Sequence, residues 1–316
     1  MNNALKLNQE EQAVLEFDLE VVTNVKEVKK KKRVHSPIRW FGGKFYLAKH
    51  IIPLMPKHHC YVEPFGGGGH VLTQKDPSKV EVWNDIDGDL INFLMTLRTD
   101  KTQLLEALMT LPTSRLLCEK WQNEPMPEDG FERAVRWYYL LRQTIVPANN
   151  QKSGWRHGKI KSVAFDYQNS VKRLNDFEER IRAVNIECLD FRDLITRYDS
   201  PETFFFIDPP YVGREGAYKG GFTRQDHIEL AQLLSTIKGK ALVSYYHDPL
   251  IDTLYKDWNL FEVDGLVAPG VTKAEKGQKK RKEIECFFTN YDLDNYDKVI
   301  IAEQKNTIEQ TQLSLF

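Results

Sequence analysis

The stretch Phe204-Phe205-Phe206-Ile207-Asp208-Pro209-Pro210-Tyr211 decides the fold class of this chain. Its run of four apolar residues is typical of a strand that is buried on both faces of a parallel sheet. The prolines end that strand because they cannot donate to the sheet and because they fix φ. Open α/β sheets bind their ligands at the carboxyl ends of their strands. We therefore expect an α/β protein with Asp208 and Tyr211 at the ligand-binding edge.

Asp208 and Tyr211 suit the recognition of an amino group on an aromatic ring. The carboxylate can accept a hydrogen bond from an exocyclic amino group, and the phenol ring can stack on the ring that carries it. A strand that merely ends in a proline turn with an aspartate at its tip is the alternative interpretation. A site for a second substrate elsewhere in the chain would favour the interpretation that Asp208 and Tyr211 bind a substrate.

Such a site is indicated upstream, where residues 61–65 predict a short strand and a helix is expected to begin near His70. Residues 66–69 between them are all glycine, which lets the backbone approach a ligand closely and point amides into a site. The spacing differs from the dinucleotide fingerprint and no Walker lysine follows, so pyrophosphate binding is poorly supported. Because Glu63 adds negative charge here, a cationic ligand fits better than a phosphate.

Residues 80–83 predict another strand, which ends at Asn84 and Asp85. An acidic residue at the end of the second strand of a nucleotide-type fold typically holds the ribose hydroxyls. A glycine run alone is often only a loop, and Asn-Asp alone is often only a turn. Their order and spacing together are stronger evidence for a nucleotide-type site.

Four motifs of the chain, in this order, resemble those of the DNA N6-adenine methyltransferases of the Dam type. They are Arg39-Trp40-Phe41-Gly42-Gly43-Lys44, Glu63-Pro64-Phe65 with residues 66–69, Asn84-Asp85-Ile86 and Asp208-Pro209-Pro210-Tyr211. The resemblance extends from about residue 37 to about residue 290. It implies a Rossmann-like methyltransferase fold with a mostly parallel sheet, S-adenosylmethionine as methyl donor, and a mainly helical target-recognition insertion.

The resemblance also implies roles for particular residues at the cofactor. Lys44 suits the methionine carboxylate, and Asp85 takes the ribose. Phe191 matches, more loosely, an aromatic that packs against the adenine of the cofactor; a buried core phenylalanine fits the sequence equally well. The expected cofactor-binding residues are Trp40, Lys44, Glu63, Phe65, Gly66, Asp85, Phe191 and Asp208.

Asp208, Pro209 and Tyr211 are the expected catalytic residues. The N6 nitrogen of adenine is a poor nucleophile because its lone pair is delocalised into the ring. The Asp208 carboxylate and the Pro209 carbonyl can accept its two hydrogens, and the carboxylate can stabilise the positive charge that develops on nitrogen. The base must flip out of the duplex, and Tyr211 offers a ring to replace the lost stacking. This chemistry requires no metal.

Composition is that of a soluble enzyme: 316 residues, 41% hydrophobic, with net charge −1. Its four cysteines, Cys60, Cys118, Cys188 and Cys286, form no C-x-x-C pair, so we expect buried thiols in a reducing compartment rather than disulfides or a zinc site. No apolar stretch approaches membrane-spanning length, and the N-terminus lacks a signal peptide. We expect a cytoplasmic, bacterial or phage-encoded monomer that does not bind membranes.

Because the net charge is near zero, local basic clusters must supply the contacts to double-stranded DNA. The run at residues 29–33 fits a solvated tail as well as a DNA contact. In two later clusters, aromatic or glycine residues alternate with the basic side chains, which favours contact with the DNA backbone. The expected DNA-binding residues are Lys152, Arg156, Lys159, Lys279, Lys280 and Arg281.

We expect four segments. They are a flexible charged tail (1–33), a catalytic domain (34–97 and 186–293), a target-recognition insertion (98–185) and a C-terminal tail (294–316).

Helical periodicity in the insertion covers residues 104–111, 131–145 and 167–181, and Pro125 and Pro127 separate the first two helices. We expect Trp137, Tyr138 and Tyr139 in its core. In the loop at 147–158, the polar residues Asn149, Asn150, Gln151 and Arg156 are candidates for contacts with base edges. A helical subdomain whose loop touches only phosphates is the alternative.

The last five residues, Gln312-Leu313-Ser314-Leu315-Phe316, resemble the short peptide by which bacterial DNA-processing proteins dock on the sliding clamp. That resemblance implies that Gln312, Leu313, Leu315 and Phe316 fill adjoining pockets of the clamp. A frayed tail, or one that folds back on its own domain, is the alternative.

Three functions remain open. The leading hypothesis is site-specific methyl transfer from S-adenosylmethionine to N6 of a flipped adenine in DNA, as in restriction–modification. A methyltransferase of the same fold could act on cytosine N4, on RNA or on a protein amide, although related enzymes for other amines more often carry Ser or Asn where this chain has Asp208. A non-catalytic, clamp-associated DNA-binding protein is the third, which the set Lys44, Asp85, Asp208 and Tyr211 disfavours.

Overall fold

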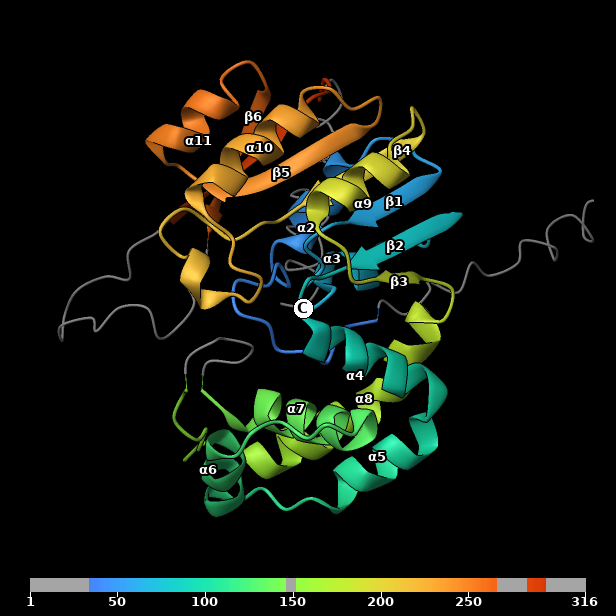
Figure 1. The fold of residues 1–316 in the computed structure, drawn as a ribbon, viewed down its shortest axis with the longest axis vertical. Coiled ribbons are helices and arrows are strands. Elements are labelled where there is room, and N and C mark those ends of the chain that lie inside the picture. The colour runs from blue at the N-terminus through green and yellow to red at the C-terminus, as the bar shows by residue number, and fades with distance from the viewer. Residues whose placement is uncertain (1–33, 146–151, 266–282, 294–316) are drawn as a thin grey trace, which may run out of the picture. The chain divides into compact units, whose positions relative to one another are not determined.

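The computed structural model describes residues 34–145, 152–265 and 283–293. Within them the chain forms a mixed α/β structure with a seven-stranded sheet in the order β3-β2-β1-β4-β5-β7-β6 (Figure 1). The strands are β1 Cys60–Glu63, β2 Val80–Asn84, β3 Asn185–Glu187, β4 Thr203–Ile207, β5 Lys240–Tyr246, β6 Asn259–Gly265 and β7 Glu283–Thr289. Neighbours from β3 through β5 are parallel, and β7 is antiparallel to both β5 and β6. The expected α/β class and mostly parallel sheet are confirmed.

Strand β4 is buried along its whole length, as its apolar sequence predicts. Successive strand side chains point to opposite faces of a sheet. Accordingly, Phe204 and Phe206 belong to one core cluster, and Phe205 and Ile207 belong to the other. Helices cover both faces, which is the usual environment of a parallel sheet.

The helices divide between these two clusters. On one side of the sheet, α9, α10 and α11 contribute Leu194, Leu230 and Ile251 to the cluster that contains Phe205 (Figure 1). On the other side, α2, α3, α4 and α8 join the cluster that contains Phe204. The helices are α2 Ala48–Ile51, α3 His70–Gln74, α4 Gly88–Thr99, α5 Lys101–Thr110, α6 Arg115–Asn123, α7 Gly130–Gln143, α8 Val163–Ile181, α9 Phe191–Tyr198, α10 Arg224–Leu234 and α11 Pro249–Leu254, with short 3-10 turns η1 Ile52–Leu54 and η2 Glu215–Ala217.

Helices α5, α7 and α8 lie where the periodicity predicts them, and the chain leaves α6 before Pro125 and enters α7 after Pro127. Helix α6 was not expected from the sequence. Its start signal is Ser114, whose side chain accepts a hydrogen bond from the Leu117 amide at 3.3 Å, which is a typical N-cap. The expectation that Trp137, Tyr138 and Tyr139 are core residues is confirmed, because all three are buried.

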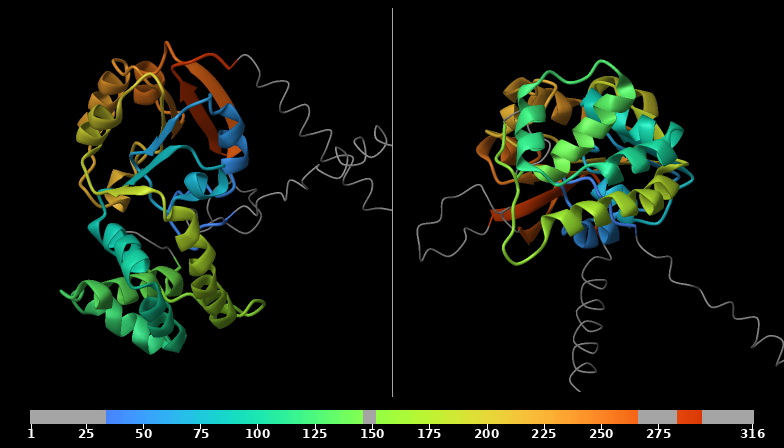
Figure 2. Two further views of the ribbon diagram at one scale, coloured as in Figure 1. Left: turned by 90° about the vertical axis from the view of Figure 1, so that its right-hand side faces the viewer. Right: turned by 90° about the horizontal axis from the view of Figure 1, so that it is seen from below.

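Helices α5 to α8, called the helical group below, belong to the same hydrophobic cluster as one face of the sheet. Leu104 of α5, Tyr138 of α7 and Leu174 of α8 belong to the same cluster as Trp83 of β2 and Phe204 of β4. Figure 2 shows α8, in yellow-green, running between the other helices of the group and the strands. The division of the chain at residues 98 and 185 therefore stays a proposal based on sequence.

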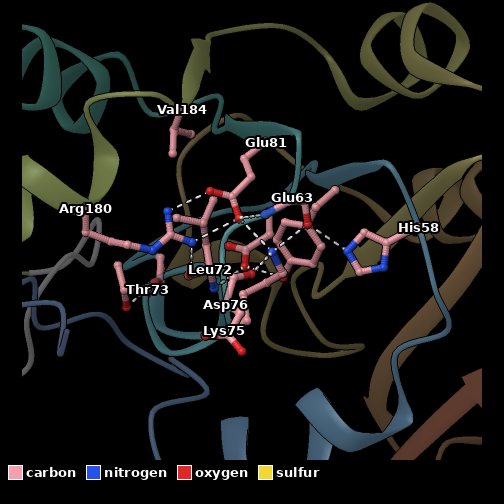
Figure 3. Close-up of polar contacts among 12 residues, drawn as sticks. His58, Glu63, Leu72, Thr73, Lys75, Asp76, Glu81, Arg180 and Val184 are labelled. Carbon is pink, nitrogen blue, oxygen red and sulfur yellow. Dashed lines mark hydrogen bonds and ion pairs between the residues drawn. The ribbon is translucent and has the colours of Figure 1, made fainter. Parts of the chain in front are cut away.

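A buried ionic cluster ties α8 to the sheet (Figure 3). Arg180 of α8 donates to both carboxylate oxygens of Glu81 on β2, at 2.6 and 2.9 Å, and to the Leu72 carbonyl of α3. Lys75 donates to the same Glu81 carboxylate at 2.6 Å. The side chains of Lys75 and Glu81 are each 4% exposed, and that of Arg180 is 9% exposed. The two cations share one carboxylate, so each ion touches a counterion and none is an isolated buried ion, whose cost would be large.

The strand order places the loops after β1 and β4 side by side. Strand β1 has β2 on one side and β4 on the other, with Val62 paired to both Val82 and Phe205. The chain proceeds outward from β1 to β2 and β3, and then returns to build the other half from β4. This reversal is the topological switch point, where open α/β sheets bind ligands.

The cysteines differ in part from the expectation of buried thiols. Cys118 and Cys286 are buried, but Cys60 is only partly buried and Cys188 is exposed. Cys188 follows β3, the outermost strand at that edge of the sheet, so no neighbouring strand covers it. Among the residues described, no helix is both long enough and apolar enough to cross a membrane.

Candidate active site

Asp208 follows β4 and pairs with a lysine from the start of the described chain. The Lys44 ammonium donates to Asp208 Oδ1 at 2.6 Å and to the Gly42 carbonyl at 3.1 Å. The side chain of Lys44 is 6% exposed, and that of Asp208 is 17% exposed. Two residues of separate sequence motifs thus form one nearly buried ion pair at the sheet edge.

A second carboxylate, which the sequence analysis did not identify, lies on the other side of Lys44. Glu285 of β7 is 3.6 Å from the Lys44 ammonium and is buried. It accepts hydrogen bonds from the Tyr211 hydroxyl and, at 2.7 Å, from Ser244 Oγ of β5. No motif marks Glu285; only its place in an otherwise apolar strand, Ile284-Glu285-Cys286-Phe287-Phe288, could have drawn attention to it.

The charges of this group influence one another. Burial alone would lower the pKa of Lys44, but the neighbouring Asp208 and Glu285 carboxylates raise it above its ordinary value, so Lys44 stays an ammonium. Burial raises the pKa of Asp208 to about 6, while Lys44 opposes that rise. Asp208 is therefore ionised at neutral pH and is poorly solvated.

Tyr211 stands beside the ion pair with its ring held on several sides. Its hydroxyl lies 3.0 Å from Ser244 Oγ, and its ring centroid is 4.7 Å from the Tyr246 ring in an edge-on arrangement. The Lys44 ammonium lies 4.8 Å from the same centroid. These contacts fix the orientation of the ring that the sequence analysis assigned to base stacking.

The four glycines after β1 are buried, and side chains of the protein pack where their Cβ atoms would be. A Cβ on Gly67, whose φ is +47°, would lie 2.5 Å from Trp40 Nε1. Gly66 and Gly69 face the Trp83 ring in the same way, and Gly68 faces His70. Packing inside the protein thus already requires glycine here. Trp40 lies against the glycine loop, and its expected place at the cofactor stays a prediction.

Asp85, at the end of β2, is tied to the glycine loop. Its Oδ2 accepts from the Gly67 amide at 2.8 Å, and its Oδ1 accepts from the Asp87 amide at 2.9 Å. The preceding Asn84 donates to the carbonyls of Pro64 and Leu189, which fixes the ends of β1 and β3 relative to β2. Burial raises the pKa of Asp85 to about 6.

Glu63 is the third carboxylate of this region and is buried at 2% exposure. Its Oε1 accepts from the Tyr61 hydroxyl at 2.6 Å and from the Leu72 amide of α3 at 2.8 Å. Burial raises the pKa of Glu63 to about 7, and the negative charge of Asp208 acts in the same direction. The structure thus shows a role for Glu63 in fixing α3 that the sequence analysis did not foresee.

Phe65 and Phe191 meet in an aromatic cluster beside the glycine loop. Their ring centroids are 5.5 Å apart, and Phe222 lies 5.8 Å from Phe65 and 5.9 Å from Phe191. Phe191 is 5% exposed and belongs to a core cluster, so it has the environment of a core residue, while Phe65 and Phe222 are only partly buried. The sequence analysis missed Phe222.

The expected DNA-binding residues are only partly described. Lys152 donates to Asn123 Oδ1 at 2.6 Å, and Arg156 forms an ion pair with Asp166 at 2.6 Å. Lys159 is exposed. Lys279, Lys280 and Arg281, the candidates Asn149, Asn150 and Gln151, the tail at 1–33 and the terminal residues 312–316 lie outside the described residues.

Two arginines that sequence reasoning missed lie close to Arg156. Arg142 of α7 donates to the same Asp166 carboxylate at 2.8 Å, and Arg39 donates to the carbonyls of Thr144 and Ile145. Burial and then the positive charges of Arg156 and Arg142 lower the pKa of Arg39 to about 10, although Asp166 opposes this. The Asp166 carboxylate therefore pairs with two guanidinium groups while a third, that of Arg39, has only carbonyl partners, so positive charge is in surplus here.

The switch-point site and the mostly parallel sheet define an α/β enzyme of the methyltransferase fold. A family model for the D12 class N6 adenine-specific DNA methyltransferases matches residues 40–268. Because that match spans well over half of the chain, the protein belongs to this family. It is an adenine-specific DNA methyltransferase, a class of enzyme that requires a methyl donor.

Curated relatives agree with this assignment. The chain is 26% identical over 274 residues to the type II methyltransferase M1.LlaDCHI of Lactococcus lactis subsp. cremoris, covering 80% of this chain and 94% of the relative. It is 27% identical over 275 residues to a DNA adenine methylase of Salmonella typhimurium, covering 81% and 96%. The type II methyltransferase M.MjaIII of Methanocaldococcus jannaschii is 25% identical over 291 residues, covering 80% and 98%.

Proposed function

We propose that this enzyme takes its methyl group from S-adenosylmethionine and transfers it to N6 of an adenine that is flipped out of double-stranded DNA. The observation that carries the proposal is the pairing of Asp208 with Lys44 at the switch point, beside the glycine loop and the Tyr211 ring. The carboxyl-terminal edge of the sheet thus offers a carboxylate for the amine, a cation for a carboxylate and an aromatic ring for a base.

The chemistry of the donor set fits a cationic nucleoside. Glu63, Asp85 and Asp208 all lie at the loops after β1, β2 and β4, and burial raises the pKa of each, to about 7, 6 and 6. Desolvated carboxylates that lack enough positive charge favour a ligand that brings some. S-adenosylmethionine carries an ammonium and a sulfonium, and the sulfonium supplies a methyl group that is already activated for transfer.

We assign the binding roles by the chemistry of each side chain. Lys44 would pair with the methionine carboxylate, and Asp85 would accept hydrogen bonds from the ribose hydroxyls. Phe65 and Phe191, with Phe222 beside them, would pack against the adenine ring of the cofactor. Trp40, Glu63 and Gly66 complete the set that we place at the cofactor.

The reaction depends on positioning the target amine. Asp208 and the Pro209 carbonyl would accept the two hydrogens of N6, which favours a pyramidal nitrogen with an available lone pair. Asp208 would also stabilise the positive charge that develops on N6. Alignment of this kind can lower a barrier by about 7–11 kcal/mol. Tyr211, whose ring is fixed by Ser244 and Glu285, would stack on the flipped base.

DNA phosphates would be held by the basic side chains near the helical group. Lys152, Arg156 and Lys159 are the expected contacts. The surplus positive charge near Arg156 supports adding Arg39 and Arg142 to this set. Lys279, Lys280 and Arg281 complete the expected set from the sequence. Phosphate contacts of this kind position the enzyme, and contacts to base edges specify the sequence.

Calorimetry and product analysis test this proposal. The wild-type protein should bind S-adenosylmethionine, and digestion of DNA treated with both should yield N6-methyladenine by mass spectrometry. Lys44→Met should weaken binding of the donor, whereas Lys49→Met, at an exposed position five residues on, should not. Absence of donor binding in the wild type, or N4-methylcytosine as sole product, would refute it.

For the terminal peptide, residues 312–316, the sequence alone supports a separate proposal about a binding partner. We propose that Gln312, Leu313, Leu315 and Phe316 dock on the bacterial sliding clamp. Removal of residues 312–316 should abolish retention on immobilised clamp in a pull-down while methyl transfer to short duplexes stays intact. Equal retention of the truncated and complete chains would end the proposal.

A further inference from the structure

The electrostatics of the site raise a problem that the proposed catalytic residues do not solve. Lys44 lies 2.6 Å from Asp208 and compensates its charge. A carboxylate neutralised in this way does little to attract a second cation. Yet the proposed reaction brings a sulfonium to this site and develops positive charge on the target amine. A further anionic group is required if the pocket is to favour those charges.

Glu285 meets that requirement by position and by charge. It lies 3.6 Å from the Lys44 ammonium, on the strand β7 that follows β5 in the sheet. Lys44, Asp208 and Glu285 together carry two carboxylates and one ammonium, so the trio has a net charge of −1. At 2% exposure, Glu285 is also screened little by water.

The hydrogen bonds of Glu285 hold that charge in place. The Tyr211 hydroxyl and Ser244 Oγ, which donate hydrogen bonds to Glu285, are neutral, so they satisfy the carboxylate without cancelling its charge. Tyr211 and Ser244 are themselves 3.0 Å apart, which closes a triangle of polar groups. Burying an extra anion is costly for folding, and a cationic ligand would offset part of that cost.

We propose that Glu285 is a positioning residue that keeps the Lys44–Asp208 pair net negative, so that the pocket selects the sulfonium form of the cofactor over its neutral thioether product. This inference rests on the proposed function. It assigns to Glu285 a task that neither Asp208 nor Tyr211 performs: product release is favoured because the thioether lacks the charge that Glu285 stabilises.

The test compares the affinities of two ligands that differ in one methyl group and one charge. S-adenosylmethionine and S-adenosylhomocysteine share the adenosine, the ammonium and the carboxylate, so the ratio of their dissociation constants isolates the sulfonium. In Glu285→Gln, which keeps the size of the side chain, the ratio should move toward the thioether by about fivefold. Glu285→Asp keeps the charge and should restore the wild-type ratio.

Neutral changes to the same network are the matched controls. Tyr211→Phe and Ser244→Ala remove hydroxyls that contact Glu285 but leave the net charge, so the ratio should stay at its wild-type value even where turnover falls. Glu262→Gln removes an exposed carboxylate from the neighbouring strand β6 and should not alter the ratio either. A structural role alone would make Glu285→Gln resemble Tyr211→Phe.

A second substitution, which removes a positive charge instead of a negative one, keeps the inference testable if Glu285→Gln does not fold. Lys44→Met removes the ammonium, weakens both ligands through their common carboxylate, and should move the ratio toward the sulfonium. A ratio within about twofold of wild type in Glu285→Gln or Lys44→Met, with both ligands bound, overturns the inference and leaves the proposed function standing. A wild-type protein that binds neither ligand overturns both.

Discussion

The Lys44 ammonium lies 2.6 Å from Asp208 Oδ1, although 164 positions of sequence separate the two residues. Lys44 comes from the loop before α2 and Asp208 from the carboxyl end of β4. Their contact joins the Arg39–Lys44 motif to the Asp-Pro-Pro-Tyr motif in one polar group. The carboxylate proposed to receive the target amine is thereby oriented by the cation proposed to hold the methyl donor.

Replacing Asp208 should remove catalysis and preserve the fold. Asp208→Asn keeps the shape of the side chain but loses the negative charge that stabilises the developing cation, so methyl transfer should fall by about 10²-fold or more. Lys44 keeps Glu285 as a counterion, and burial already disfavours the ionised form of Asp208, so the melting temperature should change little. Asp193→Asn, at an exposed position of α9, is the matched control and should retain full activity. Wild-type turnover by Asp208→Asn would contradict the assignment.

Activity should depend on pH through the same carboxylate. Burial raises the pKa of Asp208 to about 6, and only the ionised form can accept hydrogen bonds from both oxygens. The ratio kcat/KM, which reports ionisations of the free enzyme, should therefore rise with pH through about 6. In Lys44→Met, the loss of the neighbouring positive charge should move this midpoint to higher pH. A profile that is flat between about pH 5 and 8 would exclude Asp208 as the titrating group.

Glu63→Gln should stabilise the protein at high pH and weaken the cofactor. Because burial raises the folded-state pKa to about 7, above the ordinary 4.5, ionisation of Glu63 opposes folding. This penalty is absent below the unfolded-state value, grows as the pH rises from that value to the folded-state value of about 7, and is constant above it. The Gln side chain can still accept from Tyr61 and Leu72 through its oxygen. Urea unfolding should therefore show a gain that is small at pH 4.5 and reaches up to about 3 kcal/mol near pH 8.

If Glu63 also contacts the donor, calorimetry on the same variant should show weaker binding of S-adenosylmethionine. If the gain in stability over the wild type is the same at both pH values, the Glu63 carboxylate is solvated better than its position indicates. Unchanged donor affinity would confine Glu63 to its structural contacts with Tyr61 and Leu72.

The buried ionic cluster of Figure 3 predicts a stability defect without a direct effect on chemistry. Arg180→Met removes the hydrogen bonds to Glu81 and to the Leu72 carbonyl but leaves the Lys75–Glu81 pair, which should cost about 1.5–3 kcal/mol in the free energy of unfolding. Chemical denaturation measures this loss. Lys120→Met, on α6, removes an exposed ammonium that lies 3.8 Å from the exposed Glu124 carboxylate and should remain close to wild type. Equal free energies of unfolding for the two variants would contradict a stabilising role of Arg180.

DNA binding should show the salt dependence of a phosphate contact at Lys159. Lys159→Ala should weaken binding to duplexes of any sequence and reduce the slope of log affinity against log salt by about 1. Fluorescence anisotropy at several salt concentrations measures the slope. Lys172→Ala, at an exposed position of α8, is the control and should leave the slope unchanged. Loss of affinity at one recognition sequence alone would instead place Lys159 at a base edge.

The sequence by itself determined the elements with strong local signals. The run of residues 204–207 predicted a strand buried on both faces, and the periodicity of residues 131–145 and 167–181 predicted helices that the structure contains. The order of the motifs gave the family, because each motif is a short contiguous stretch. In contrast, α6 was missed because the segment at 115–123 has few buried residues to set its period.

Only the tertiary structure decided which charges meet. Glu285 lies on the antiparallel strand β7, and its contacts with Lys44 and Tyr211 depend on the insertion of β7 beside β5. Arg39 and Arg142 likewise reach the neighbourhood of Arg156 through packing between distant segments. Hydrophobic period and turn chemistry act over a few residues and can be found along a sequence. Electrostatic pairing depends on distances in space, which the strand order fixes and the spacing of residues does not reveal.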